Sequence, residues 1–253
     1  MIFSRYVAVL AVAAVTATPT AAGADTTLGQ LVYNFTYSAS QSITARDSSN
    51  SLENPNEGGG ISGGSNSGMS HYAGNLTDKG TMTVTVVKKQ PDGALVVMIG
   101  EQGENIRRAS PAECVVYGNT HVICDPNKTV YTEEYTLLRF LASNFVDPSQ
   151  LDASRHWSIV ESSGDGMSVR ADYTIDSNNS GIMQIGEKRS VKESGAGHLT
   201  TDIETKIGYD FTRLVPTSVD EYATQYTDSG ISGTSKTTYQ TTLQLVSDSM
   251  AKT

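Results

Sequence analysis

The sequence predicts an all-β protein, mainly antiparallel, folded as a strongly curved meander sheet or an open barrel with one helix packed on it. Three observations predict this class. Apolar and polar residues alternate over long stretches, turn-forming residues separate those stretches, and helical spacing appears in one segment, residues 132–146. Such alternation is typical of antiparallel strands that bury one face and leave the other in water. We expect roughly ten to twelve strands.

The clearest hairpin covers residues 81–99. Methionine and valines alternate with threonines over 81–86, and a second apolar alternation follows over 95–99. Between them lies Gln90-Pro91-Asp92-Gly93, where proline presets φ at the second turn position and glycine accepts a positive φ. Further alternating segments, which predict strands on the same grounds, are residues 31–37, 169–175, 203–211 and 239–245.

The helical segment is residues 132–146. Tyr135, Leu138, Leu141 and Phe145 follow near-helical spacing, and Leu137 and Phe140 widen this apolar stripe. Thr132 is the expected N-cap, and the next two residues, Glu133 and Glu134, complement the positive end of a helix. We therefore interpret these two glutamates as helix-start charges and the stripe as the face that packs on the sheet.

The first 24 residues have the pattern of a signal peptide. Arg5 supplies a positive charge, residues 6–15 are an apolar run, and Ala22-Gly23-Ala24 offers a cleavage site before Asp25. The run is too short to span a bilayer, which takes about 20 residues. No cysteine lies at this site, so no lipid anchor is expected there. The sequence thus predicts a soluble exported protein, periplasmic or extracellular.

Residues 25–253 are expected to form a single β-rich domain. Within them, residues 45–72 are rich in Gly, Ser and Asn and predict a flexible loop. The net charge of the whole chain is −9. An acidic chain argues against nucleic acid as a partner, because the phosphates would repel it. No later segment is long and apolar enough to predict a membrane-spanning helix.

The two cysteines, Cys114 and Cys124, predict a disulfide. An even cysteine count in an exported chain favours this pairing. A three-residue loop at 118–120 would make 114 and 124 directly opposed positions of a hairpin, which lie within disulfide range. A two-thiol metal site or a redox pair are the alternatives, but the spacing is not that of a CxxC motif.

Two short motifs suggest chemistry. Gly60-Ile61-Ser62-Gly63-Gly64 fits the nucleophile-elbow pattern of hydrolases, but it lies in a Gly/Ser-rich tract without the required strand and helix. The second motif resembles the calcium loop of an EF-hand, although strands rather than helices are expected on both sides of it. We take it as a weak calcium candidate and otherwise as a polar hairpin turn. Its residues are Asp176, Asn178, Ser180, Gly181 and Glu187.

The sequence favours a non-enzymatic exported binding protein, such as a carrier for a lipid or another apolar or amphipathic small molecule, because a curved sheet capped by a helix commonly encloses a pocket for such a ligand. A secreted structural or surface-interaction protein is the alternative, and a secreted hydrolase ranks third, since no nucleophile–base constellation is evident and the four histidines form no cluster. No cofactor is indicated, and the oligomeric state is left open.

The succession of hairpins resembles, in architecture alone, the half-barrel carriers of periplasmic lipid and lipoprotein transport. Those carriers usually begin with a helix, whereas this chain begins with a strand, and no diagnostic motif matches. Because one fold hosts many functions, the resemblance implies the shape of the sheet and no more.

Overall fold

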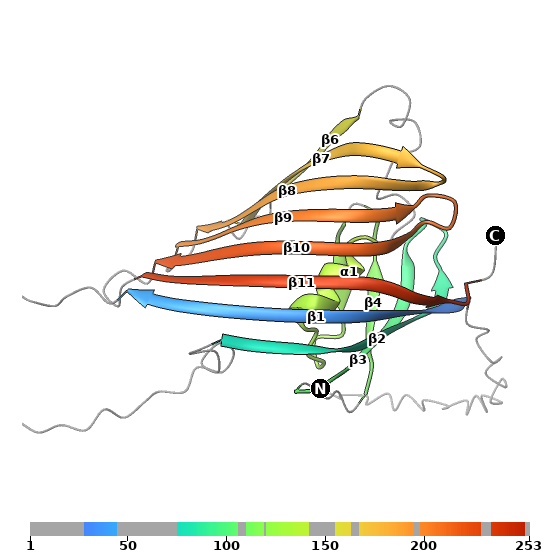
Figure 1. Ribbon diagram of the computed structural model, residues 1–253, viewed down its shortest axis with the longest axis horizontal. Coiled ribbons are helices and arrows are strands. Elements are labelled where there is room, and N and C mark those ends of the chain that lie inside the picture. The colour runs from blue at the N-terminus through green and yellow to red at the C-terminus, as the bar shows by residue number, and fades with distance from the viewer. Residues whose placement is uncertain are drawn as a thin grey trace, which may run out of the picture.

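The structure is a computed structural model, and it describes residues 28–44, 75–105, 110–118, 120–141, 155–162, 167–194, 198–228 and 234–250. The expected signal peptide at 1–24, the flexible loop at 45–72 and the Ser62 motif lie outside these residues. Within the described part of the chain, eleven strands form one antiparallel sheet that is not closed (Figure 1). The all-β class with one helix is therefore confirmed.

The strands are long, and they follow one another along the sheet almost in chain order. Their bounds are β1 Gly29–Thr44, β2 Asn75–Lys89, β3 Leu95–Gly103, β4 Ala112–Val116, β5 Val122–Cys124, β6 His156–Ser162, β7 Met167–Asn179, β8 Ile182–Ser194, β9 His198–Asp210, β10 Val215–Asp228 and β11 Thr234–Asp248.

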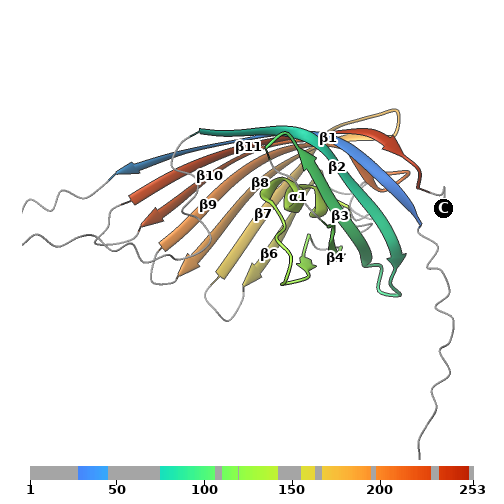
Figure 2. The same cartoon turned by 90° about the horizontal axis from the view of Figure 1, so that it is seen from below.

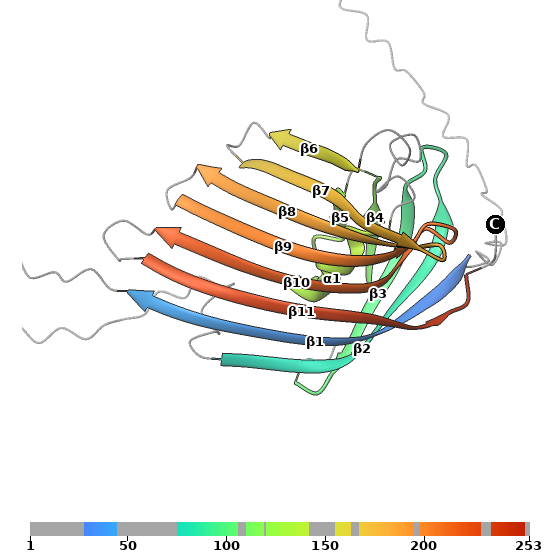
Figure 3. The same ribbon diagram turned by 45° about the horizontal axis from the view of Figure 1, so that its top comes forward.

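The order across the sheet is β5-β4-β3-β2-β1-β11-β10-β9-β8-β7-β6. The first and last strands pair with each other in the middle of the sheet, and β5 and β6 form the two edges. The only helix of the described residues, α1 (Thr132–Leu138), lies in the connection between these edges. Figures 2 and 3 show that the sheet curves strongly and that α1 lies on its concave side.

The predicted hairpins are confirmed. The hairpin of β2 and β3 turns at residues 90–93, where the Gly93 N–H donates to the Gln90 carbonyl and Gly93 has a φ of 90°. The hairpin of β4 and β5 pairs Cys114 with Cys124 in direct register, and the two are joined by a disulfide. Local turn chemistry was sufficient to predict both features.

The helix is shorter than the sequence predicted. It begins after an N-cap at Tyr131, not at Thr132, and it ends at Leu138 rather than near 146, while residues 142–146 lie outside the described residues. Leu137 and Leu138 are fully buried, whereas Tyr135 is exposed. The apolar stripe continues past the helix end into a turn that buries Phe140 and Leu141, so helical spacing in the sequence did not require a helical backbone throughout.

The apolar core lies between α1 and one half of the concave face. A cross-strand row of buried side chains forms its floor: Ile175, Ile185, Ile207, Val219, Leu243 and Phe35. Each strand contributes one residue to this row, and directly paired residues of neighbouring strands point to the same face of the sheet. The core therefore fills the space under the helix.

Candidate functional site

A row of polar side chains runs across the concave face, directly beside the apolar core. It consists of directly paired residues on seven neighbouring strands, and we call it the polar belt. In order from β7 to β2 its members are Tyr173, Glu187, Thr205, Glu221, Thr241, Tyr37 and Asp78. All seven are buried. Buried polar groups need hydrogen-bond or ion-pair partners, so the stability of this row depends on the contacts that its members make.

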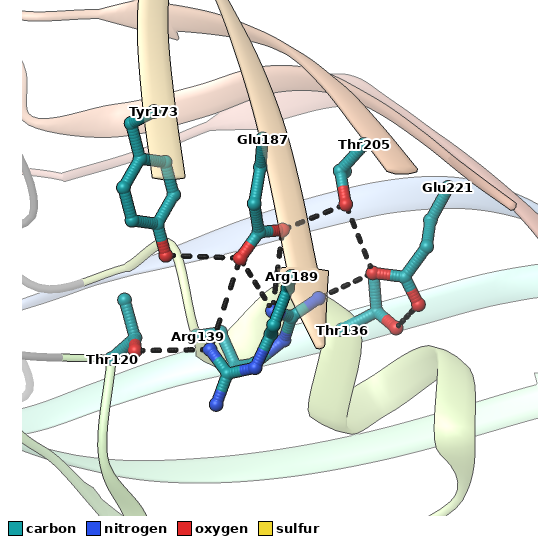
Figure 4. Close-up of polar contacts among 8 residues, drawn as sticks. All are labelled: Thr120, Thr136, Arg139, Tyr173, Glu187, Arg189, Thr205 and Glu221. Carbon is teal, nitrogen blue, oxygen red and sulfur yellow. Dashed lines mark hydrogen bonds and ion pairs between the residues drawn. The ribbon is translucent and has the colours of Figure 1, made fainter. Parts of the chain in front are cut away.

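Arg139 lies over the belt and pairs with two of its carboxylates. This residue directly follows α1, and its side chain is 3% exposed. Its Nη1 lies 3.0 Å from Oε1 and 3.3 Å from Oε2 of Glu187, and its Nη2 pairs with Oε2 of Glu221 (Figure 4). One arginine thus joins β8, β10 and the end of the helix.

Hydroxyl groups complete this network. Tyr173 donates to Glu187 Oε1 at 2.9 Å, and Thr205 donates to Glu187 Oε2 at 2.7 Å. From the helix, Thr136 donates to Glu221 Oε1 at 2.8 Å. Both oxygens of Glu187 and of Glu221 therefore accept hydrogen bonds, so each buried charge is both paired and bonded, as a buried ion pair requires.

The pKa values of two groups in this network, Arg139 and Tyr173, are shifted. Burial alone would lower the pKa of the Arg139 guanidinium, but Glu187 and Glu221 outweigh burial and raise that pKa above its ordinary value. Burial, and then the charge of Glu187, raises the pKa of the Tyr173 phenol. Arg139 therefore stays charged and Tyr173 stays neutral, so neither group is poised for proton transfer near neutral pH.

A second polar cluster lies at the other end of α1. Glu101 on β3 is buried close to Glu133 and Glu134 of the helix and to Asp78 of β2. Burial, followed by the nearby charges of Glu133, Glu134 and Asp78, raises the pKa of Glu101 to about 9. Its carboxyl is therefore protonated at neutral pH. Glu133 and Glu134 lie in the first turn of α1, as the sequence predicted, and Glu134 accepts a hydrogen bond from the Tyr131 N–H at 2.9 Å. Both glutamates are also buried, which the sequence did not indicate.

Beyond the belt, away from the core, the concave face gradually opens; its first row is mainly apolar, and the rows after it mix apolar residues with threonines, glutamines and Glu193. The next cross-strand row contains Ala171, Arg189, Ile203, Ala223, Tyr239 and Ala39. Val191 and Leu199, further along, are partly exposed. By strand alternation Ile43 and Met167 end this face, and they are 65% and 42% exposed. We call this region the open concave face.

Arg189 is the residue of this face that lies next to the belt. Its Nη1 is 3.8 Å from Glu187 Oε1 and 3.3 Å from the Thr120 hydroxyl, which belongs to the connection between β4 and β5 (Figure 4). Arg139 lies closer to the same carboxylate. Through Arg189, the hairpin of one sheet edge reaches across to β8, so the curved sheet is bridged on its concave side.

The structure separates the residues of the calcium candidate. Asp176 lies on the convex face beside Gly186, Asn178 is near the end of β7, and Ser180 and Gly181 form the turn with φ values of 53° and 84°. Glu187 points to the opposite, concave face, where Arg139 holds it. Among the described residues, no group of three or more His, Cys, Asp or Glu could hold a metal ion.

Sequence reasoning missed the polar belt and Arg139. The sequence did contain a signal. Glu187 follows Met183 and Ile185 at every second position, and Glu221 lies between Val219 and Ala223 with the same spacing. Both glutamates therefore occupy positions at which the alternation predicts a buried apolar residue. A charged residue at such a position indicates a buried charge that has a partner. Which arginine it pairs with could not be read from the sequence.

The chain matches no model of a known protein family, and it matches no curated protein. Within the described residues, no helix is long and apolar enough to cross a membrane. The function is therefore argued from the geometry of the concave face.

Proposed function

We propose that this chain is an exported, non-enzymatic binding protein that holds an apolar or amphipathic ligand on its open concave face. The observation that supports the proposal is the exposure of Ile43 and Met167, together with partly exposed Val191 and Leu199, on a concave surface. Met167, Val191 and Leu199 lie on the neighbouring strands β7, β8 and β9, whereas Ile43 lies on β1 at the far side of the same face. Exposed apolar side chains on a concave surface are typical of ligand sites.

The division of the concave face supports the same function. The half under α1 is a filled core, and the belt separates it from the open half. A ligand on the open half would therefore leave the core intact. The network chemistry also favours binding over catalysis, because Glu187 and Glu221 are buried and fully hydrogen bonded.

A neutral fluorescent probe tests this proposal. N-phenyl-1-naphthylamine gains fluorescence in apolar surroundings, so titration of the full chain after signal removal should give a saturable increase. The substitutions Ile43→Gln and Met167→Gln should weaken binding, and Val160→Gln serves as the control. Val160 is 68% exposed on the convex side of β6, so its substitution should leave binding unchanged. Absence of saturable binding, or equal effects of all three variants, would contradict the proposal.

The secreted interaction protein is the second candidate. Tyr222 and Tyr226 on β10 are exposed on the convex face, where aromatic residues could contact a macromolecule. Native mass spectrometry of protein purified from its own host separates the two functions. Co-purifying lipid supports the carrier, and a bare mass together with no probe binding favours the interaction protein.

A further inference from the structure

We propose that the ligand of the open concave face is an amphipathic anion, a molecule with an aliphatic chain and one carboxylate or phosphate group, and that Arg189 binds the anionic group. This inference rests on the proposed function and narrows it to a chemical class. It is carried by the hydrogen-bonding state of Arg189 and by the residues around it.

Arg189 uses little of its donor capacity. A guanidinium has five N–H donors in a rigid fork that matches carboxylate and phosphate groups. Within the described part of the chain, the hydrogen bond of Arg189 is one contact of 3.3 Å to Thr120, and its ion pair with Glu187 is long at 3.8 Å. This arginine is only 9% exposed. A charged group so deeply buried normally has several short hydrogen bonds.

Glu187 cannot supply the missing partners. Its two oxygens already accept from Arg139, Tyr173 and Thr205 at 2.7 to 3.3 Å. The contrast between the two arginines is direct: Arg139 is held by short contacts to two carboxylates, and Arg189 is not. Some buried side-chain atoms of this protein have no hydrogen-bond partner, but no nitrogen of Arg189 is among them. Its spare N–H groups therefore reach accessible space.

The surroundings of Arg189 specify the rest of the ligand. On its cross-strand row it is flanked by Ala171 on β7 and Ile203 on β9. Val191, two residues further along β8, leads toward the exposed end of the concave face. A cation at the inner end of an apolar surface matches a ligand with a charged head and an aliphatic tail. The head would lie against the belt, and the tail would lie over Val191 and its cross-strand partner Val169 toward Met167 at the end of β7.

The experiment measures competition against N-phenyl-1-naphthylamine with three ligands that share one chain: oleate, oleoyl lysophosphatidic acid and methyl oleate. The wild-type protein should bind at least one of the two anions about tenfold or more tightly than the ester, because a charge-assisted hydrogen bond is lost in the ester. The relative affinity of the two anions distinguishes a carboxylate from a phosphate ligand. This comparison needs no variant.

The matched variants are Arg189→Gln, Arg189→Lys and Arg170→Gln. Arg189→Gln should weaken anion binding about tenfold or more and leave methyl oleate unchanged. Arg189→Lys should keep part of the affinity, since it keeps the charge but loses the fork. Arg170 pairs with Asp172 on the exposed convex face, so Arg170→Gln should change nothing. Melting curves of each variant check that it folds.

The outcomes distinguish this inference from the function beneath it. If the neutral probe and methyl oleate bind as tightly as the anions, the protein is an apolar-ligand carrier and the role of Arg189 is wrong. The same conclusion follows if Arg189→Gln weakens the anions and the ester equally. If neither the probe nor any of the three ligands binds, the proposed function itself fails.

Discussion

Arg139, the residue that follows helix α1, lies 3.0 Å from Glu187 of β8 and contacts both oxygens of that carboxylate. The same guanidinium pairs with Glu221 of β10. The helix is seven residues long, which is too short to be stable alone. Its place on the concave face therefore depends on its buried leucines and on this ion network.

Removal of Arg139 should destabilise the fold strongly. In Arg139→Met, Glu187 and Glu221 lose their closest cation while they stay buried, so the free energy of unfolding should fall by about 3–5 kcal/mol. Urea denaturation followed by circular dichroism measures this difference. Arg170→Met is the control, and it should change the free energy of unfolding by about 1 kcal/mol or less, because its ion pair with Asp172 is exposed.

Removal of the whole charge set tests the reason for that loss. Arg139→Met combined with Glu187→Gln and Glu221→Gln leaves no uncompensated acid at the belt, so it should be more stable than Arg139→Met alone. A single Arg139→Met variant as stable as wild type would show that the network does not hold the helix.

Glu101 should make the protein less stable as pH rises. Its pKa is about 9 in the folded protein because of burial and the nearby charges of Glu133, Glu134 and Asp78. In the unfolded chain a glutamate titrates near 4.3, so between about 4.3 and 9 the folded state binds one more proton than the unfolded state. Stability from this group is therefore complete below the lower value, falls across the interval and levels off above about 9.

The matched variant is Glu101→Gln, which mimics the protonated carboxyl at every pH. Melting temperatures measured from pH 5 to pH 9.5 should decline less steeply for this variant than for wild type, and the two curves should separate most at the alkaline end. Parallel curves would mean that Glu101 is ionised in the folded protein.

The sequence predicted the parts of this fold that depend on local patterns. Alternation at 169–175 and 203–211 identified two strands, although the second strand ends at Asp210, and the Pro91-Asp92-Gly93 turn identified a hairpin. These features were predictable because side-chain alternation and turn preference depend on neighbouring residues. The helix was predicted too long because the buried Phe140 and Leu141 continue the helical spacing in a non-helical turn.

The candidate site could not be predicted from the sequence, for a different reason. The belt exists only when β1 pairs with β11 and seven strands align in register, and no local signal in the sequence indicates the pairing of β1 with β11. Arg139 and Glu221 are 82 residues apart, and Thr120 and Arg189 are 69 apart. Contacts of this kind depend on the tertiary fold, so residue types alone could indicate buried charges but not their partners.

Calcium should have little effect on stability. Asp176 and Glu187 point to opposite faces of the sheet, and the oxygens of Glu187 already accept hydrogen bonds from Arg139, Tyr173 and Thr205. We therefore expect the same melting temperature in millimolar calcium and in chelator. A rise of several degrees in calcium that Asp176→Ala abolishes would instead establish an ion site at this turn.

The disulfide of the β4–β5 hairpin should carry a measurable share of the stability. Cys114 and Cys124 are opposed in register and separated by ten residues, so reduction frees a short loop in the unfolded chain. Cys114→Ser should lower the free energy of unfolding by about 2–4 kcal/mol. If the cross-link itself is responsible, Cys124→Ser and the double variant should each cost about as much as the first, rather than the sum. Intact-mass measurement of the exported protein should show two hydrogens fewer than the reduced form, and full alkylation without reductant would refute the bond.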